Sequence, residues 1–411
     1  MILFINRTYA PDTEAVGQLL TELAEALVEK GHRVEVLATN GQFSGNRNGV
    51  SLHKVGGEPV FSRGSFLSRA WSYLRLYPHL YKKAWGLAKN ALVITSTDPP
   101  MHYVFAVLLK KLRGSQLIHW SQDLYPEVAE ELEVLKKGGL TARFFRRLST
   151  WALSQQDAII AVGRCMKDRL VARGIPPEKI VVIQNWTDIQ KVYPIPHGSN
   201  PFRGLHHLGK KFIVMYSGNF GLAHPFDEIL ESARILQKQN PNIHFVLIGD
   251  GPRKAQIEQF IQEQNLVNVL LLPYQPKKVL AESLSAADLH LATMFPNLLG
   301  LVVPSKVYGI MAVGRPVIFM GSAESEVARL IQENKTGDIL ESLSIQNLVE
   351  RIEWWSQNAY KREIAGLNAR QAIEQKDLSS VVRQFERLFE HVAGKSLLPN
   401  QSLSIPLERV R

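Results

Sequence analysis

The sequence predicts an α/β fold with two parallel sheets, and three observations support this prediction. Short apolar runs alternate with longer amphipathic stretches along most of the chain, as they do in βα units. The alternation stops once near the middle of the chain and then starts again. A chain of 411 residues, 45% of them hydrophobic, is also long enough to form two separate cores.

The first series of elements begins with a strand over residues 2–5 and a helix from about Glu14 to Lys30, which Gly31 ends. Each later strand is a short apolar run bounded by polar or helical stretches. These strands are expected over residues 34–38, 91–96, 116–121, 157–162 and 180–185.

The middle of the chain differs in composition from both halves. Residues 191–211 contain three prolines and three glycines without a periodic apolar face, so they are predicted to form a linker. The second series follows with a strand over 211–218 and a helix over 225–239. Its other strands are expected over residues 243–251, 268–273, 287–293 and 315–320.

The predicted organisation is an N-terminal domain over residues 1–190, the linker, and a C-terminal domain over 212–375. A helix over 376–395 is expected to cross back to the N-terminal domain, and residues 396–411 are expected to form a flexible tail. Parallel sheets bind ligands at the carboxyl ends of their strands. The ligand site is therefore expected in a central cleft between the two domains.

The charge of the chain, +10, restricts its partners. Residues 1–200 carry 25 Lys and Arg against 17 Asp and Glu, so most of the excess lies in the first half. Such an excess favours anionic lipid or phosphorylated substrates; nucleic acid is not expected, because no RNA- or DNA-binding motif is found. The single Cys165, the absence of a signal-peptide pattern and the absence of an apolar run of about 18 residues predict a cytoplasmic protein.

Several strand–helix turns are candidates for anion binding, because the free N–H groups at a helix N-terminus attract negative charge. Glycines in these turns permit close approach of the backbone to a ligand. Taken singly, each is also an ordinary turn of an α/β protein. The candidates are the turn over residues 9–20 and the glycines Gly218, Gly221, Gly249 and Gly251.

A further turn stands out by its charge. Between Asp288 and Glu324 there is no carboxylate. Pro304 and Ser305 are expected to start a helix with Ser305 as the N-cap, which places Lys306 in the first turn. A cation there opposes the helix dipole, whereas a bound diphosphate accounts for it. A solvated surface lysine is the alternative.

Two polar residues of the first domain lie in, or just after, the strand expected over residues 116–121. Asp123 lies in a loop just after the strand over 116–121, where groups that face a ligand emerge. His119 lies within that strand, so it is either a catalytic group or a buried structural histidine. Asp123 could also stabilise a turn, but its place in the loop favours a function.

Basic and aromatic residues alternate in two segments, over residues 61–89 and 140–153. A basic amphipathic helix of this kind can lie on an anionic membrane surface. The alternative is that the aromatic side chains are packed core and the charges are solvated. A peripheral location on the inner face of the cell membrane is therefore also considered.

The motifs together resemble family 4 of the glycosyltransferases, which are retaining enzymes of the GT-B fold with two Rossmann-like domains facing across a central cleft. The segments that carry the resemblance are SQDLYPEVA (121–129), YSGNFGLAHPFDEILESARIL (216–236), FVLIGDGPRK (245–254) and VPSKVYGIMAVGRPVI (303–318). The branch that they are similar to builds bacterial surface polysaccharides, such as colanic acid and O-antigen.

The resemblance implies retaining, hexosyl-type transfer from a nucleotide sugar, with UDP-sugars favoured, to a polyprenyl-diphosphate-linked or other glycan acceptor. Neither a metal nor another cofactor is expected, and the sequence contains no metal-ligand cluster. The catalytic candidates are Asp123, His119 and Lys306. The donor-binding candidates are Gly17, Gly218, Asn219, Gly221, Gly249, Gly251, Pro273, Tyr274, Gln275, Pro304, Ser305, Lys306 and Gly309.

The chain departs from the family at the sites that grip the ribose and the phosphates. Two glutamates eight positions apart are replaced by Leu301 and Gly309, or by Leu299 in an alternative register. The usual arginine after the Gly-Asn turn is replaced by the sequence FGLAH. Glu324 and Glu326 are candidate substitutes. A non-catalytic sugar-nucleotide-binding partner and a nucleotide-sugar epimerase therefore remain alternatives.

Overall fold

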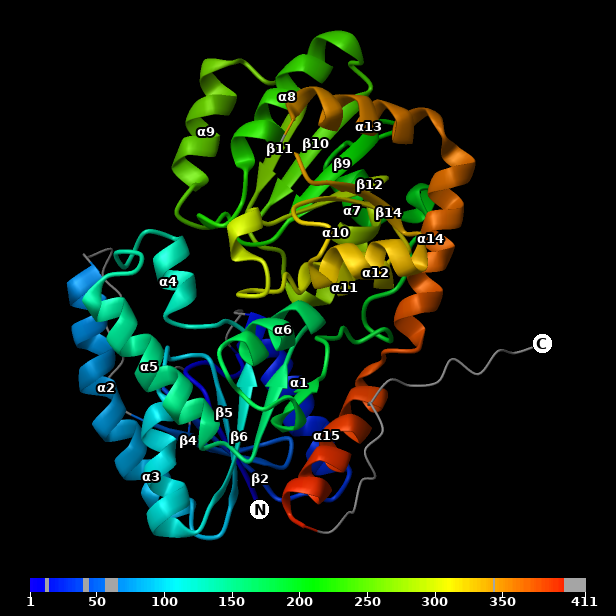
Figure 1. The fold of residues 1–411 in the computed structure, drawn as a ribbon. Coiled ribbons are helices and arrows are strands. Elements are labelled where there is room, and N and C mark those ends of the chain that lie inside the picture. The colour runs from blue at the N-terminus through cyan, green and yellow to red at the C-terminus, as the bar shows by residue number, and fades with distance from the viewer. Residues whose placement is uncertain (12–14, 40–43, 56–65, 343, 395–411) are drawn as a thin grey trace. The chain divides into compact units, whose positions relative to one another are not determined.

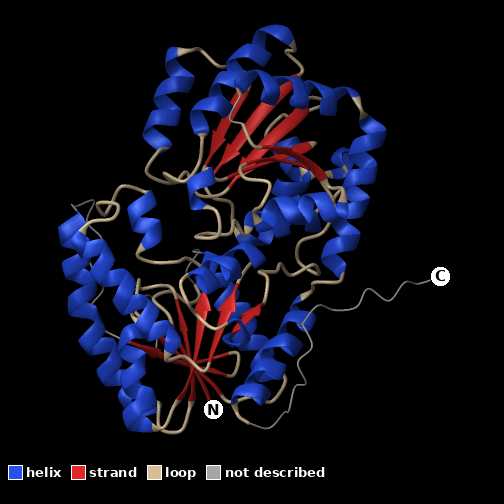
Figure 2. Ribbon diagram, in the orientation of Figure 1, coloured by secondary structure: helices blue, strands red, loops and turns tan. Residues whose placement is uncertain are grey.

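The computed structural model of the protein describes residues 1–11, 15–39, 44–55, 66–342 and 344–394, without the side chains of residues 66–72 and 74. The chain divides into two compact units. The first unit contains Met1–Gln184 and Ser379–Arg411, and the second contains Asn185–Leu378. Each unit is a sheet with helices on both faces, so the predicted α/β fold is confirmed (Figure 1, Figure 2).

The first unit is built on an eight-stranded sheet in the order β3-β4-β2-β1-β5-β6-β7-β8. All neighbouring strands are parallel except β3 and β4, which are antiparallel. The strands are β1 (Ile2–Ile5), β2 (Val34–Ala38), β3 (Gly45–Arg47), β4 (Val50–Lys54), β5 (Leu92–Ser96), β6 (Gln116–Ser121), β7 (Ala158–Ala161) and β8 (Ile180–Val182).

The helices of the first unit cover both faces of this sheet, because its central strands are apolar on both sides. In β6, Leu117 belongs to the core beneath α2 and α3, whereas Trp120 contacts Phe385 of α15. The helices are α1 (Ala15–Glu29), α2 (Phe66–Leu87), α3 (Tyr103–Arg113), α4 (Glu127–Glu131), α5 (Leu140–Ser154), α6 (Arg164–Ala172), α15 (Leu378–Val392) and the short 3₁₀ helix η1 (Pro177–Lys179).

The last described helix, α15, packs on the first unit, far from its neighbours in the sequence. The Trp120 and Phe385 ring centroids are 5.6 Å apart. His32 Nε2 lies 2.8 Å from Glu386 Oε1, and the Gln116 side chain donates a hydrogen bond to the Val392 carbonyl oxygen. The helix thus completes the core of the unit that contains the chain's N-terminus. The predicted tail over 396–411 lies outside the described residues.

The second unit is built on a six-stranded, fully parallel sheet in the order β11-β10-β9-β12-β13-β14. Its strands are β9 (Phe212–Ser217), β10 (Ile243–Ile248), β11 (Val269–Leu272), β12 (Leu289–Thr293), β13 (Val317–Met320) and β14 (Gly337–Leu340). Its helices are α7 (Pro201–Leu205), α8 (Phe226–Gln239), α9 (Lys254–Glu263), α10 (Leu280–Ser285), α11 (Lys306–Ala312), α12 (Glu326–Asn334), α13 (Ile345–Gln357), α14 (Ala359–Glu374) and the 3₁₀ helices η2 (His197–Ser199), η3 (Lys277–Val279) and η4 (Pro296–Leu298).

The segment that precedes β9 is tied closely to this sheet. Arg203 of α7 is buried, and its guanidinium donates to the carbonyl oxygens of Ala286, Gly209 and Lys211. Among the described residues, none of the helices combines the length and the apolar character that crossing a bilayer requires.

Candidate active site

The predicted donor-binding turns of the second unit meet at the carboxyl edge of its sheet. The turn after β9 is hydrogen-bonded to the turn after β10: Gly218 N donates to Ile248 O, and Phe220 N donates to Asp250 O. Gly249 N donates in turn to Leu272 O, at the end of β11. Because three successive strands end side by side, the structure brings these turns together.

Two of the glycines are required by this close packing. A Cβ atom at Gly249 would lie 2.0 Å from the Gly218 carbonyl oxygen, and one at Gly251 would lie 2.5 Å from Asn219 Oδ1. Both glycines also have positive φ angles, of 158° and 151°, which other residues rarely adopt. Gly249 and Gly251 therefore set the shape of the turn, whether or not they also contact a ligand.

Lys306 points into this group of turns. A Cβ atom added to Gly218 would lie 3.0 Å from Lys306 Nζ, and Nζ lies 3.7 Å from the centroid of the Tyr216 ring. The ammonium nitrogen is buried and has no hydrogen-bond partner among the described residues. Burial lowers the pKa of Lys306 to about 7. A buried cation without a carboxylate is the arrangement expected where an anion binds.

Ser305 does not act as the predicted N-cap. It precedes α11, but its backbone is helical and its side chain makes no capping hydrogen bond. The prediction was wrong because Ser at a helix start caps only with an extended backbone, in which the hydroxyl faces the free N–H groups. Lys306 still begins α11, as expected.

His224 belongs to the same group of side chains and was not predicted. The Tyr216 and His224 ring centroids are 5.8 Å apart. His224 Nδ1 lies 2.8 Å from the Thr293 carbonyl oxygen, so this nitrogen carries the proton and Nε2 is free to accept. Burial and the charge of Lys306 lower the pKa of His224 to about 3, which keeps the ring neutral. The signal in the sequence was FGLAH, where the family's arginine is missing.

The other predicted donor residues lie around the same edge. Pro273, Tyr274 and Gln275 follow β11, with Tyr274 exposed and the Gln275 side chain hydrogen-bonded to Pro273 O. A Cβ atom at Gly221 would lie 3.1 Å from Asn219 Nδ2, and Pro304 is buried just before α11.

The positions of the missing glutamates are packed against other side chains. A Cβ atom at Gly309 would lie 3.2 Å from Leu284 Cδ1, and Leu301 is buried. Of the candidate substitutes, Glu326 is fully buried at the start of α12, whereas Glu324 is exposed. Glu324 alone of these two is open to a ligand.

In the first unit, Asp123 lies at the carboxyl edge of the sheet. The Thr97 hydroxyl oxygen accepts hydrogen bonds from Gln122 N (2.8 Å) and Asp123 N (3.2 Å), which fixes the loop after β6. The Asp123 carboxyl group is partly buried and makes no hydrogen bond or ion pair with another described residue. Burial, followed by the charge of Asp98, raises the pKa of Asp123 to about 7. This group can hold or release a proton at neutral pH.

His119 and Gly17 have structural explanations. His119 is buried in β6, 3.0 Å from Thr95 Oγ1 and with its ring 4.2 Å from the Tyr103 ring, and burial lowers its pKa to about 3. These observations favour the alternative of a buried structural histidine over a catalytic group. Gly17 lies in α1, where a Cβ atom would be 2.8 Å from Thr8 Oγ1. Residues 12–14 of that turn lie outside the described residues.

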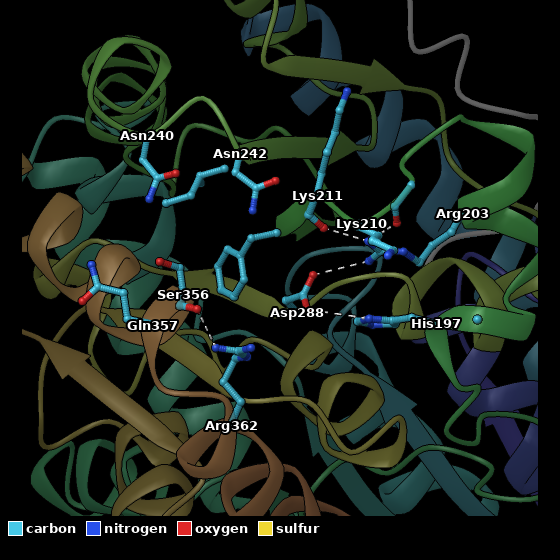
Figure 3. Close-up of a pocket in the computed structure, with 14 residues that line it drawn as sticks. His197, Arg203, Lys210, Lys211, Asn240, Asn242, Asp288, Ser356, Gln357 and Arg362 are labelled. Atoms are coloured by element: carbon cyan, nitrogen blue, oxygen red, sulfur yellow. Dashed lines mark hydrogen bonds and ion pairs between the residues drawn. The ribbon is translucent and has the colours of Figure 1, made fainter.

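A pocket of about 520 Å³ in the second unit lies at the opposite edge of the sheet (Figure 3). Phe212 and Ile243, which begin β9 and β10, are part of its lining. Some of its polar side chains are hydrogen-bonded within the unit: Asp288 accepts hydrogen bonds from Ile213 N and Arg203, and Arg362 donates to Ser356 O. Since parallel sheets bind substrates at their carboxyl edge, this pocket is not the candidate site.

No group of three or more His, Cys, Asp or Glu side chains in the described ranges is placed to hold a metal ion. The polar groups at the carboxyl edge of the second unit's sheet are instead an ammonium, an imidazole and backbone amides. Such a set suits a phosphorylated ligand.

Two family models match nearly the whole chain. Glycosyltransferase Family 4 matches residues 16–191, and Glycosyl transferases group 1 matches residues 201–372. The chain belongs to glycosyltransferase family 4. The two models meet close to the boundary between the two units, so each describes one unit of this glycosyltransferase.

Relatives agree with this membership, and solved structures share the fold. WbjE, a protein of Pseudomonas aeruginosa named as a glycosyltransferase, is 28% identical over 61% of this chain and 62% of its own length. WcaI of Escherichia coli K12, named as a colanic acid biosynthesis glycosyl transferase, is 24% identical over 80% of this chain and 86% of its own. The structure of Anabaena Alr3699/HepE in complex with UDP and glucose has a TM-score of 0.75 at 16% identity, covering 95% of this chain and 99% of that one. The fold of the glycosyltransferase is thus GT-B, as predicted.

Proposed function

We propose that the protein is a retaining, metal-independent glycosyltransferase that moves a hexosyl group from a UDP-sugar to a lipid-linked or other glycan acceptor in surface polysaccharide biosynthesis. The observation that carries this proposal is the buried Lys306 ammonium, which has no partner among the described residues and lies against Gly218. UDP is favoured because the HepE structures contain UDP and UDP-glucose, and the role in polysaccharide synthesis follows the names of relatives such as WcaI.

The donor's diphosphate is assigned to the second unit. Lys306 supplies a positive charge, and the turn from Gly218 to Gly221 supplies backbone and Asn219 amide donors. Charge that develops on the departing diphosphate is stabilised most where water is excluded and the donors are already in place. The burial of Nζ provides that condition, so the turn and Lys306 are expected to supply much of the rate enhancement.

The acceptor is assigned to the first unit, at Asp123. With a pKa raised to about 7, this carboxyl group can hydrogen-bond an acceptor hydroxyl in either protonation state. In a front-face transfer, which retains the anomeric configuration, the leaving diphosphate takes the acceptor's proton. Asp123 then orients the acceptor, and its removal should lower the rate of transfer more than the affinity for donor.

The test is a panel of UDP-, GDP- and ADP-sugars with membrane extracts or glycan acceptors, with and without EDTA. We expect release of UDP, transfer that retains the anomeric configuration, and no effect of EDTA. Lys306→Met should abolish turnover and weaken donor binding, whereas Lys238→Met, which changes an exposed lysine of the same unit, should do neither. Donor binding without transfer to any acceptor would instead indicate a binding partner, and conversion of the sugar without acceptor would indicate an epimerase.

A further inference from the structure

Helix α5 presents its large apolar side chains outward and its small ones to the protein. Leu140, Phe144 and Trp151 have exposed fractions of 85%, 62% and 43%. At 3.6 residues per turn they fall within an arc of roughly 40°. The opposite face, which packs on the first unit, is made largely of small residues: Ala142, Ser149, Ala152 and Leu153. A helix that only covered a sheet would have the reverse arrangement.

The neighbouring helix α3 continues this apolar surface. Leu108 and Leu112, one turn apart, have exposed fractions of 52% and 63%. Helices α3 and α5 pack against each other (Figure 1), and Lys111 Nζ lies 5.9 Å from the Trp151 ring centroid, which joins the two stripes. We call the surface formed by Leu108, Leu112, Leu140, Phe144 and Trp151 the α3–α5 face.

The charges around the α3–α5 face are positive. Neither helix contains an acidic residue. Arg143 and Arg147 are exposed and form no ion pair with another described residue. The third exposed arginine of α5, Arg146, differs, since it is paired with Glu130. Arg143 and Arg147 are thus available to an external anionic partner, whereas Lys110 of α3 is paired with Asp157.

We infer that the α3–α5 face docks on an anionic lipid surface. Apolar side chains flanked by arginine and lysine are the composition by which amphipathic helices bind at lipid headgroups, with the rings below the charges. A second copy of this chain would place the same cations against each other, which opposes self-association through this face. A lipid surface supplies both the apolar layer and the negative charge.

The position of α5 links this surface to the acceptor. A helix between two parallel strands runs antiparallel to them, so α5, which connects β6 to β7, begins near the carboxyl edge where Asp123 lies. The exposed Leu140 and Phe144 are at that end of the helix. A lipid-linked acceptor would then reach Asp123 along the α3–α5 face. This last step rests on the proposed function.

The test is co-sedimentation of the full chain with vesicles of phosphatidylcholine alone and of phosphatidylcholine with one third phosphatidylglycerol. We expect binding to the anionic vesicles only. Arg143→Gln with Arg147→Gln should lower the partition coefficient roughly tenfold or more, because each basic residue near such a surface contributes about fivefold. Phe144→Ser with Trp151→Ser should lower it as well. Val267→Ser, which removes an exposed apolar side chain of the second unit, is the matched control and should leave it unchanged.

Equal binding to both vesicles, binding unaffected by these variants, or no binding at all would overturn the inference. So would a dimer in sedimentation that Phe144→Ser with Trp151→Ser dissolves, since the face would then join two copies. Binding of UDP-glucose by the same variants separates the two proposals. The variants of the α3–α5 face should still bind UDP-glucose. A wild-type protein that binds anionic vesicles but no nucleotide sugar would refute the proposed function without affecting the inferred docking surface.

Discussion

A buried ammonium group without a hydrogen-bond partner lowers the stability of the protein that carries it, and Lys306 is such a group. A carboxylate beside Lys306 would neutralise its charge. The residues around it are instead Tyr216, His224 and Gly218, none of which carries a carboxylate. Besides burial, the charge of Lys306 lowers the pKa of His224, because it opposes a second cation beside it. At the scale of single residues, these observations support the proposal that an anionic ligand supplies the missing charge.

The affinity for UDP-glucose should fall as the pH rises above about 7. The pKa of Lys306 is lowered to about 7 in the free protein, and a bound diphosphate favours the charged form. Below that pH the amine is already charged, whereas above it each binding event must take up a proton. UDP-glucose is used because its diphosphate does not titrate in this range. Calorimetry in buffers of different ionisation enthalpy should detect this uptake at pH 8.

Lys306→Arg provides the control for proton uptake, because arginine remains charged throughout this range. Proton uptake at pH 8 should disappear in this variant even if its affinity is reduced. The same uptake in wild type and Lys306→Arg would assign the titration to another group.

Asp123→Asn should stabilise the protein at pH 7.5 and have little effect at pH 4.5. The pKa of Asp123 is raised to about 7, so between about pH 4 and 7 the folded protein binds more protons at this residue than the unfolded chain. The contribution of Asp123 to stability therefore decreases as the pH rises through this window. We expect a gain of about 2 kcal/mol at pH 7.5, after allowance for partial exposure.

Urea unfolding at the two pH values measures this difference. Asp250→Asn, at an exposed residue whose side chain is 59% accessible, should show no comparable change between the two pH values. If Asp123→Asn destabilises equally at both, the carboxyl group has a structural role instead.

At the scale of elements, the turns after β9 and β10 are packed so closely that glycine is required. Gly249→Ala would bring a Cβ atom 2.0 Å from the Gly218 carbonyl oxygen, at a φ of 158°. We expect a loss of about 2–3 kcal/mol in the free energy of unfolding and weaker donor binding, because the backbone must move. Denaturant unfolding and nucleotide titration measure both. Gly198→Ala, with no atom within 4 Å of the added carbon, should be neutral.

The sequence predicted the central strands well because they are continuous apolar runs, such as residues 2–5 and 243–248. It missed β3, β4 and β14, which contain polar residues or begin with glycine. Strands near the edges of a sheet are covered on fewer sides, so their patterns are weaker.

Prediction of the site residues depended on whether the signal was local. Lys306 could be proposed from the sequence alone, because the absence of acidic residues around it can be read there. His224 was missed because its role depends on Thr293, which is 69 residues away. The sequence left both a catalytic and a structural role open for His119, because its partners, Thr95 and Tyr103, come from another strand and another helix. The surroundings of such residues are formed by segments distant in the sequence, so they can be identified only once the fold is known.

At the scale of the whole molecule, the first unit depends on a helix from the other end of the chain. Phe385→Ala in α15 should remove the contact with Trp120 and cost about 3–5 kcal/mol. Hydrogen exchange should accelerate in β6 and α15, with β9 to β13 unchanged. Arg387→Ala, on the exposed side of the same helix, should have little effect. Acceleration in both units alike would show that they unfold together.

The return of α15 also has a consequence for synthesis on the ribosome. The second unit is an insertion: the chain leaves the first unit at Gln184 and re-enters it at Ser379. The inserted unit is continuous, so it can fold as soon as its last strand and helices have emerged. The earlier-made unit must wait, with Trp120 uncovered, until α15 has been made. Chaperones that shield nascent apolar surface would therefore act on the first unit throughout synthesis of the second.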